Sequence, residues 1–475
     1  MKGEKTGKGH KLNVFVLAMM NVAVIMSLRG IPMMAKEGLS MFFYLGFAML
    51  IFLVPTSLVS AELATGWPEG GGVYRWVKEA FGGRLGFVAI WLQWIQNVIW
   101  YPTVLAFAAG ALAYLFLNPS LAYSKVYNVV VILGVYWIAT LFNFRGMKTS
   151  GWVTTFGVIG GTLFPAIVII TLGLLWWIMG NPLAFMSGSQ SILPNFKSAG
   201  NISFLAGIVL LFAGMEVSAV HAREVQNPKK DYPKAIFISA FIIFAVFTLS
   251  SLAIAAVLPA GKISLTAGIM QGVKDLLDSF SIGWMLPVLG LLMAFGAMGG
   301  VTAWIVGPSK GLFATAYDGD LPPFLERRNK NNVPTRILLI QGAVVTIISM
   351  LYLLMPNVSS AFFLLTALTA ILYLVMYIML FASAIRLRYS QPDVERVYRV
   401  PGGNFGMWFV SGVGILGALF AIIVGFFPPA QLKTGSPAFY VWFLAIGILI
   451  FICTPILIFQ LRKPDWKMRK KQGRN

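Results

Sequence analysis

Long apolar stretches separated by short polar segments recur along the whole chain. A helix needs about 20 apolar residues to cross a bilayer, and twelve stretches reach that length. Their predicted limits are 12–33, 40–61, 86–116, 125–143, 153–179, 202–222, 234–258, 282–306, 334–355, 360–385, 407–427 and 438–461. The pattern therefore predicts an all-α polytopic membrane protein with 12 transmembrane helices. An even number of spans puts both termini on the same side.

Two of these spans, the first and the sixth, are interrupted in the middle. Span one contains Gly30 and Pro32, and span six contains Ala213, Gly214 and Glu216. Proline removes a backbone donor and glycine tolerates unusual dihedral angles, so both loosen a helix. In a bilayer, an unwound backbone needs protein, water or a ligand to take its hydrogen bonds. Paired breaks in corresponding places indicate the binding site of a secondary transporter, whereas a ligand-free proline kink is the alternative for span one alone.

The spacing of the breaks, five spans, predicts an inverted repeat, because a unit with an odd number of spans enters the membrane from alternate sides. A second correspondence supports it: 68–81 and 264–280 are both amphipathic, and we expect interfacial helices there, at opposite surfaces. Residues 1–200 would form the first repeat and 201–390 the second. Residues 391–475 would add spans eleven and twelve and a short basic tail. The predicted architecture is five plus five inverted, plus two.

Charge sharpens this picture. Only 11% of the residues are charged, the net charge is +20, and soluble proteins carry about 25% charged residues. With the N-terminus inside, all but seven of the 36 Lys and Arg fall on the inner side. This follows the positive-inside rule and indicates membrane topology, with both termini cytoplasmic, rather than nucleic-acid binding. The exceptions are Arg29, Lys36, Lys125, Lys197, Lys262, Lys274 and Lys433.

Other classes of function find no support in the sequence. A single cysteine, Cys453, excludes internal disulfides. No phosphate-binding loop, catalytic triad or metal-ligand spacing occurs. We therefore expect neither an enzyme nor a cofactor. A channel would repeat polar residues along one pore-lining face and a nutrient sensor would add a signalling domain, and neither feature is visible.

Ionisable residues inside a span are candidates for the site. Arg29 either snorkels to the membrane interface or lines the central cavity and binds a carboxylate with two parallel hydrogen bonds. Glu216 either braces the broken helix, takes up a proton or attracts a substrate amine. Tyr373 and Tyr377 share one helix face, as aromatic core or as cavity lining.

Span three carries a polar face within an apolar helix. Gln93, Gln96 and Asn97 follow helical spacing among tryptophans. Amides of this kind hold neighbouring membrane helices together or line a pore, and the first interpretation is slightly favoured here.

Several motifs resemble those of the amino acid–polyamine–organocation transporters. They are SAELATGWPEGGGVY at 60–74, FAGME at 212–216, EVQNPKKDYP at 224–233, GPSKG at 307–311 and DGDLP at 318–322. Within that family the chain is most similar to the bacterial glutamate/γ-aminobutyrate antiporters. This similarity is carried by MEVSAVH at 215–221, LTAGIMQ at 265–271, WIVGPS at 304–309 and RVPGG at 399–403.

The resemblance implies the leucine-transporter fold, alternating access and exchange of an amino acid for its decarboxylated amine. It implies that Glu216 organises span six, and that Tyr373 and Tyr377 match cavity tyrosines. The residues expected to bind substrate are Met26, Ser27, Arg29, Gly30, Phe212, Ala213, Gly214, Glu216, Trp304, Tyr373 and Tyr377.

The sequence departs from the family pattern in two places. Arg29 stands where relatives have an uncharged break, which argues against a dicationic substrate. The short tail also lacks the C-terminal plug of the acid-resistance antiporters.

The sequence thus predicts an amino acid antiporter of a bacterial inner membrane, exchanging a glutamate-like substrate for a γ-aminobutyrate-like amine. Its partners would be small amino acids and amines and the lipid bilayer, with the protein a monomer or a homodimer. The alternative is a proton-coupled importer with Glu216 carrying the proton.

Overall fold

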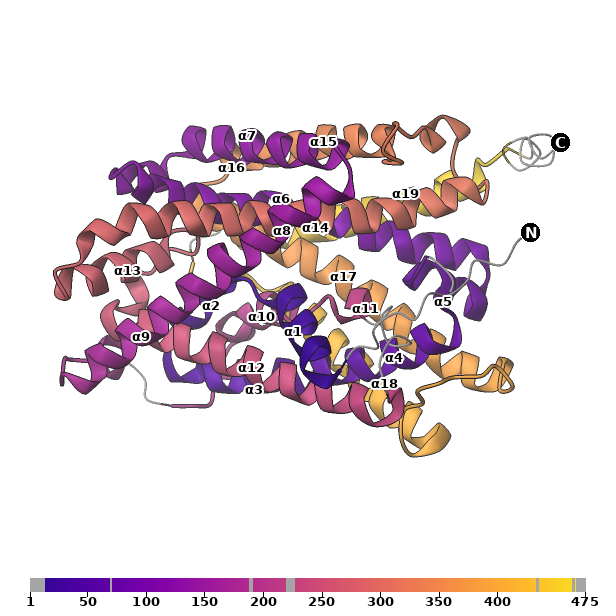
Figure 1. Ribbon diagram of the computed structural model, residues 1–475, viewed down its shortest axis with the longest axis horizontal. Helices are drawn as coiled ribbons and strands as arrows, with labels where there is room; N and C mark the ends of the chain where they lie inside the picture. The colour runs from indigo at the N-terminus through magenta and orange to yellow at the C-terminus, as the bar shows by residue number, and fades with distance from the viewer. Residues whose placement is uncertain are drawn as a thin grey trace.

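The structure is a computed structural model that describes residues 13–68, 71–187, 191–218, 227–432, 435–463 and 466. Every element in these residues is helical, and most helices run side by side along the length of the molecule (Figure 1). Eleven are long and apolar enough to cross a membrane, and one bent pair adds a twelfth span. The prediction of an all-α polytopic membrane protein is confirmed.

The first five spans are built from eleven helical segments. They are α1 (Val14–Ile25), η1 (Leu28–Gly30) with α2 (Ile31–Lys36), α3 (Met41–Ala48), η3 (Met49–Leu53) with α4 (Val54–Gly66), α6 (Gly83–Leu115), α7 (Lys125–Phe144), and α8 (Met147–Val158), η5 (Ile159–Leu163) with α9 (Phe164–Ile178). The segments η3 and η5 are π-helical turns within otherwise α-helical spans.

The remaining spans are mostly single long helices. They are α10 (Phe204–Leu211) with α11 (Met215–Ser218), α12 (Pro228–Val257), α14 (Leu286–Tyr317), α15 (Thr335–Ser349) with α16 (Leu351–Leu354), α17 (Val358–Ser390), α18 (Gly403–Gly425) and α19 (Pro437–Gln460). Span six was predicted to continue to residue 222, and its last four residues lie outside the described part of the chain.

Both predicted breaks are present. Span one unwinds at Met26 and Ser27, and the axis turns by 53° between the two halves. Span six unwinds between α10 and α11, where Gly214 has φ +123°. Residues with a Cβ rarely adopt that backbone conformation, so this break requires glycine.

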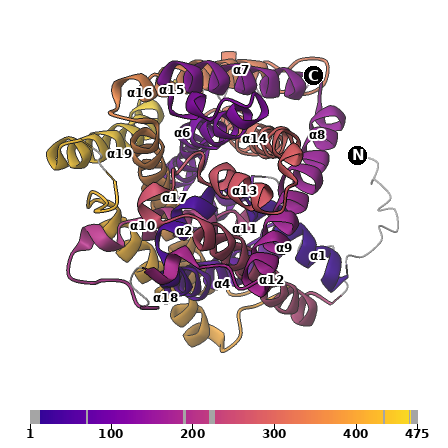
Figure 2. The same cartoon turned by 90° about the vertical axis from the view of Figure 1, so that its left-hand side faces the viewer.

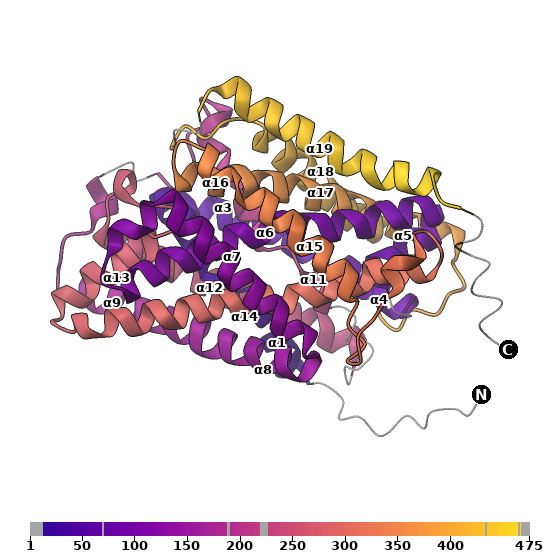
Figure 3. The ribbon, with the colours of Figure 1, turned by 90° about the horizontal axis from the view of Figure 1, so that it is seen from above.

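The broken spans lie inside the bundle. Figure 2 looks along the helices and shows α2 and α10 near the middle. The adjacent α6 and α17 are the most buried membrane helices, whereas α19 runs along the outside of the molecule (Figure 3). The core is therefore built around α6, α17 and the two breaks.

Two short amphipathic helices occupy opposite ends of the bundle: α5 (Val73–Phe81) and α13 (Gly268–Ser279) (Figure 1). We refer to these as the α5 end and the α13 end. Their predicted apolar faces are buried, but against protein: α5 packs on α6 and α17, and α13 packs on α12, α14 and α9. The division of the chain at 200 and 390 into inverted units stays a prediction.

One predicted boundary is wrong. Span eight was expected to end at 306, before Gly307 and Pro308, but α14 continues through Pro308 to Tyr317. Proline in a helix interior costs one hydrogen bond, and packing along α6 and α8 holds the helix together. The extra turns carry Lys310 toward the α5 end.

Candidate functional site

A cavity of about 870 Å³ lies between the two breaks and is walled by α6, α8–η5, α14 and α17. Its lining reaches Gly72 and Val73 at the start of α5, and it includes no residue of α13 among those described. The cavity therefore extends from the middle of the bundle toward the α5 end. Ligand pockets typically measure about 300–1,000 Å³, so this one can hold an amino acid with water.

Span one contributes three of its predicted site residues to the lining: Met26, Ser27 and Arg29. Gly30 does not line the cavity but packs against the other broken helix. A Cβ at Gly30 would lie 2.2 Å from Cδ1 of Leu211. The absence of a side chain at this position thus lets the two breaks approach each other.

Arg29 is buried, with 3% of its surface exposed. Its Nη1 donates to Oγ1 of Thr103 at 3.3 Å and to Oγ1 of Thr366 at 3.5 Å. The guanidinium also lies 5.8 Å from the ring centre of Trp100 and 5.7 Å from that of Phe362. No acidic side chain among the described residues pairs with it. Arg29 does not reach the surface in this conformation.

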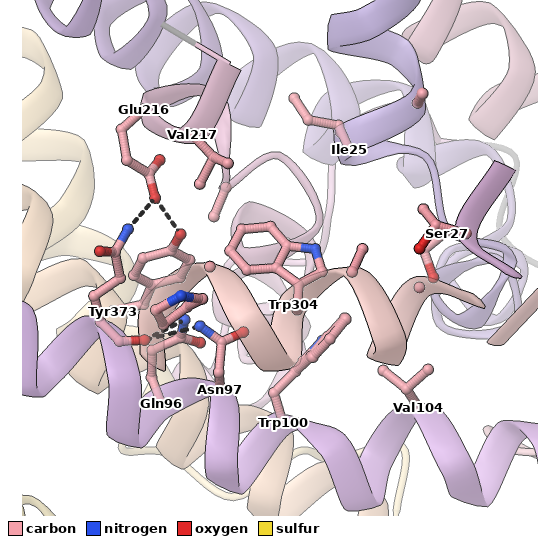
Figure 4. A pocket seen from close by; sticks show the side chains of 18 of the residues that line it. Ile25, Ser27, Gln96, Asn97, Trp100, Val104, Glu216, Val217, Trp304 and Tyr373 are labelled. Atoms are coloured by element: carbon pink, nitrogen blue, oxygen red, sulfur yellow. Dashed lines mark hydrogen bonds between the residues drawn. The ribbon is translucent and has the colours of Figure 1, made fainter. Parts of the chain in front are cut away.

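Glu216 follows the break in span six and is also buried. Its Oε1 accepts hydrogen bonds from Nε2 of Gln93, at 2.9 Å, and from the Tyr373 hydroxyl (Figure 4). Its Oε2 accepts one from the Tyr377 hydroxyl. A carboxylate has about four acceptor positions, and three are filled by neutral donors of α6 and α17. This arrangement fits a brace for the break.

Tyr377 also fixes the backbone of span six, because its hydroxyl accepts a hydrogen bond from the Gly214 amide at 2.8 Å. Tyr373 and Ala213 line the cavity, whereas Phe212, Gly214 and Tyr377 lie behind it. Phe212 packs edge-on against Phe247 of α12, with ring centres 5.8 Å apart.

A pair of tryptophans stands in the middle of the cavity. Trp304 of α14 and Trp100 of α6 meet edge to face at 6.1 Å. Figure 4 shows both rings between Glu216 on one side and Ser27 on the other. The Trp304 carbonyl accepts a hydrogen bond from the Tyr101 hydroxyl at 2.9 Å, which anchors this part of α14 to α6.

The amides of span three line the cavity rather than only joining helices. Gln93, Gln96 and Asn97 all belong to the lining. Gln93 reaches Glu216, while the side-chain amides of Gln96 and Asn97 donate to the Gln93 carbonyl at 3.2 and 2.8 Å. Both interpretations of these residues thus hold in part.

Two basic residues of the lining were not among the predicted site residues. Lys310 and Arg328 lie near the mouth, and the Arg328 guanidinium stacks 4.0 Å from the ring centre of Phe313. Lys310 was overlooked because α14 was expected to end before it. Arg328 lies outside the predicted spans, where basic residues are common, so nothing in the sequence distinguished it.

The 60–74 motif forms a buried ion cluster at the α5 end. Glu62 accepts two parallel hydrogen bonds from Nε and Nη2 of Arg388, at 2.5 and 2.6 Å, and one from the Val400 amide at 2.7 Å. Arg396 adds its charge at 3.4 Å. This cluster ties span two to span ten and to the segment before span eleven.

Polar contacts also join the spans at the α13 end. Nζ of Lys36 donates to the carbonyls of Ala260 and Ile263 at 2.9 and 3.0 Å. Glu37 accepts a hydrogen bond from Gln431 at 2.9 Å. Burial raises the pKa of Glu37 from 4.5 to about 8, which outweighs the opposing attraction of Lys36. The carboxyl therefore keeps its proton near neutral pH while these contacts persist.

Comparison with known proteins fits this architecture. A family model for amino acid permeases matches residues 12–451. The chain belongs to the amino acid permease family. Like other permeases of this family it is a multi-pass membrane transporter and not an enzyme.

Relatives of this permease match it over nearly their full length. An uncharacterized transporter of Legionella pneumophila is 45% identical, covering 94% of this chain and 96% of the relative. The glutamate/gamma-aminobutyrate antiporter of Lactococcus lactis is 30% identical, with 95% and 90% covered. A probable agmatine/putrescine antiporter of the same species is 26% identical, with 94% of each covered. The predicted similarity to glutamate/γ-aminobutyrate antiporters is confirmed.

Proposed function

We propose that this permease is an antiporter that exchanges an acidic amino acid, glutamate-like, for its decarboxylated amine, γ-aminobutyrate-like. The observation that carries the proposal is the charge of the cavity. Its described lining contains three cations, Arg29, Lys310 and Arg328, and one acid, Glu216, whose oxygens already accept neutral donors. Such a lining favours a ligand with carboxylates over a dicationic amine.

The broken backbones supply the remaining contacts. No side chain caps the start of η1 at Ser27, and the first amides of a helical segment lack intrahelical partners. We propose that a substrate carboxylate binds near Met26, Ser27 and Gly30, and that the amine binds the carbonyls at the end of α10 near Ala213. Gly214 and Glu216 would shape this site from behind, because their polar atoms already have partners.

Transport would follow alternating access, with spans one, two, six and seven rocking against the others. The excess of basic residues in the loops of the α5 end supports a cytoplasmic location for this end and for both termini, in a bacterial inner membrane. The present conformation would then be the inward-facing one. Trp304 and Tyr373, which line the cavity, would cover a bound substrate.

Proteoliposomes loaded with labelled glutamate test the exchange. We expect efflux to accelerate at least tenfold when γ-aminobutyrate is added outside. Efflux of equal rate with and without an external substrate would contradict antiport. A proton-coupled importer is the competing function, and it would fill empty liposomes with glutamate when an inward proton gradient is imposed.

A further inference from the structure

The guanidinium of Arg29 has one hydrogen-bonding edge that makes no bond to the part of the chain that the structure describes. Both hydrogen bonds that the guanidinium makes to described residues come from Nη1, to Thr103 and Thr366, and both are long for hydrogen bonds. Nε is buried without a partner, and Nη2 makes no hydrogen bond to a described residue. Nε and Nη2 form the side of the guanidinium that binds a carboxylate with two parallel bonds.

The same edge of another buried arginine shows what it binds in this protein. Arg388 uses Nε and Nη2 to grip both oxygens of Glu62, at 2.5 and 2.6 Å. Arg29 is buried to a similar degree, 3% exposed against 8%, but no acidic side chain of the described residues pairs with it. A buried charge without a partner is strongly unfavourable, and an ionisable residue inside a membrane span marks a functional site.

The surroundings hold Arg29 still rather than neutralise it. Trp100 and Phe362 offer ring faces at 5.8 and 5.7 Å. The Thr103 hydroxyl is itself fixed, because it donates to the Trp100 carbonyl at 2.7 Å, so its oxygen remains an acceptor for Nη1. A positioned guanidinium that belongs to the lining of a cavity and has unused donors is prepared for an anion.

We infer that Arg29 binds the side-chain carboxylate of the substrate, the one that decarboxylation leaves in place. This deepens the proposed function and rests on it. Glutamate and γ-aminobutyrate share an amine and a carboxylate separated by three carbons, whereas the α-carboxylate belongs to glutamate alone. One arginine that binds the shared carboxylate serves both directions of exchange. Amines that lack this carboxylate, such as agmatine and putrescine, leave the charge unpaired.

The carbon chain between the two groups has a matching surface. The Trp100 and Trp304 rings occupy the middle of the cavity (Figure 4), and Trp100 also contacts the Arg29 guanidinium. With the amine at the end of α10, methylene groups would pass along these rings to Arg29.

The first test changes the ligand and keeps the protein wild type: unlabelled compounds compete with the uptake of labelled glutamate. In wild-type proteoliposomes, γ-aminobutyrate should compete about a hundredfold better than its amide, 4-aminobutanamide. Glutamate should likewise compete about a hundredfold better than glutamine. These pairs change only the carboxylate that Arg29 is inferred to bind. Equal competition within each pair would overturn the assignment without any variant having to fold.

The variant Arg29→Met removes the charge and should bring both ratios close to one. Arg29→Lys keeps the charge without the forked edge and should retain only part of each ratio. Arg328→Met is the comparison variant, since it removes another cation from the lining of the same cavity, and it should lower each ratio far less than Arg29→Met does. A general loss of structure would weaken competition by all four ligands together and leave both ratios unchanged.

Three results would overturn the inference. If Arg29→Met weakens glutamate and glutamine equally and spares γ-aminobutyrate, Arg29 binds the α-carboxylate instead. If Arg328→Met abolishes the ratios as well, the effect is the general charge of the cavity. A third result would be that chloride raises the melting temperature of wild type but not of Arg29→Met, while each acid and its amide compete equally well. The Nε and Nη2 edge would then hold an inorganic anion. Failure of wild type to exchange glutamate at all would overturn the proposed function itself, and this inference with it.

Discussion

Replacing Gly161 with alanine should separate two helices that form one wall of the cavity. A Cβ at this position would lie 2.4 Å from Cα and N of Gly296 and 2.4 Å from the Leu292 carbonyl oxygen. All of these are backbone atoms of α14, so no side-chain rotation can relieve the contact. Carbon atoms pack best at about 3.5–4.0 Å, and the helices must therefore move apart by about 1 Å.

The neighbouring Gly160 supplies a matched control. It lies on the same π-helical segment, and a Cβ there would meet nothing within 4 Å. Overpacking costs about 1–3 kcal/mol, while replacing a helical glycine by alanine returns about 0.5–1 kcal/mol. Gly161→Ala should therefore be less stable than Gly160→Ala by about 1–3 kcal/mol.

The assay is the apparent melting temperature of each purified variant in detergent, together with its glutamate exchange rate. Stability differences of this size correspond to roughly 1–3 °C in a chain of this length. Because Gly161 and Gly296 both line the cavity, we expect Gly161→Ala to slow exchange as well. Equal melting temperatures and rates for the two variants would refute the close-approach argument.

Three further predictions concern polar contacts. Glu62→Gln should lower stability by about 3–5 kcal/mol, because it leaves Arg388 buried without its carboxylate, and thermal unfolding measures the loss. Tyr377→Phe should cost about 1–3 kcal/mol and slow exchange, since the Gly214 amide loses its buried acceptor. Finally, a carboxyl whose pKa is raised on folding binds its proton more tightly in the folded protein than in the unfolded one. The contribution of Glu37 to stability should therefore fall as pH rises from about 4.5 to about 8. Melting curves recorded across this pH range measure the change.

Each of these has an internal control. Adding Arg388→Met to Glu62→Gln should recover much of the lost stability, and a double variant as unstable as the single one would speak against the ion pair. Tyr373→Phe removes a bond to Glu216 without touching the backbone, so it should destabilise less than Tyr377→Phe. Glu37→Gln should lack the pH dependence between 4.5 and 8, and an unchanged slope would assign it to another group.

The sequence predicted the spans well because hydropathy and length alone decide whether a helix can cross a bilayer. It also located the two breaks, since glycine and proline act on the backbone where they stand. The largest boundary error, at Gly307 and Pro308, arises because these two residues were taken as the end of a span. The sequence signals that end a helix are local, and α14 is held through its proline by the helices packed along it.

Side-chain partners depended on the fold. Glu216 meets donors 123, 157 and 161 residues away, and Glu62 meets Arg388 across 326 residues. No periodicity links positions so distant, so the sequence left a brace, a proton site and an amine site for Glu216 open. Only the filled oxygens distinguish them.

For this protein, sequence by itself determined the class of molecule, the number of spans and the presence of two unwound segments, because these follow from local composition. The tertiary structure decided what surrounds the one unusual residue of the first break. Whether Arg29 reached the surface or remained inside depended on where α6 and α17 came to lie. They enclose its charge with hydroxyls and aromatic rings and leave the neutralising group to come from outside the described chain.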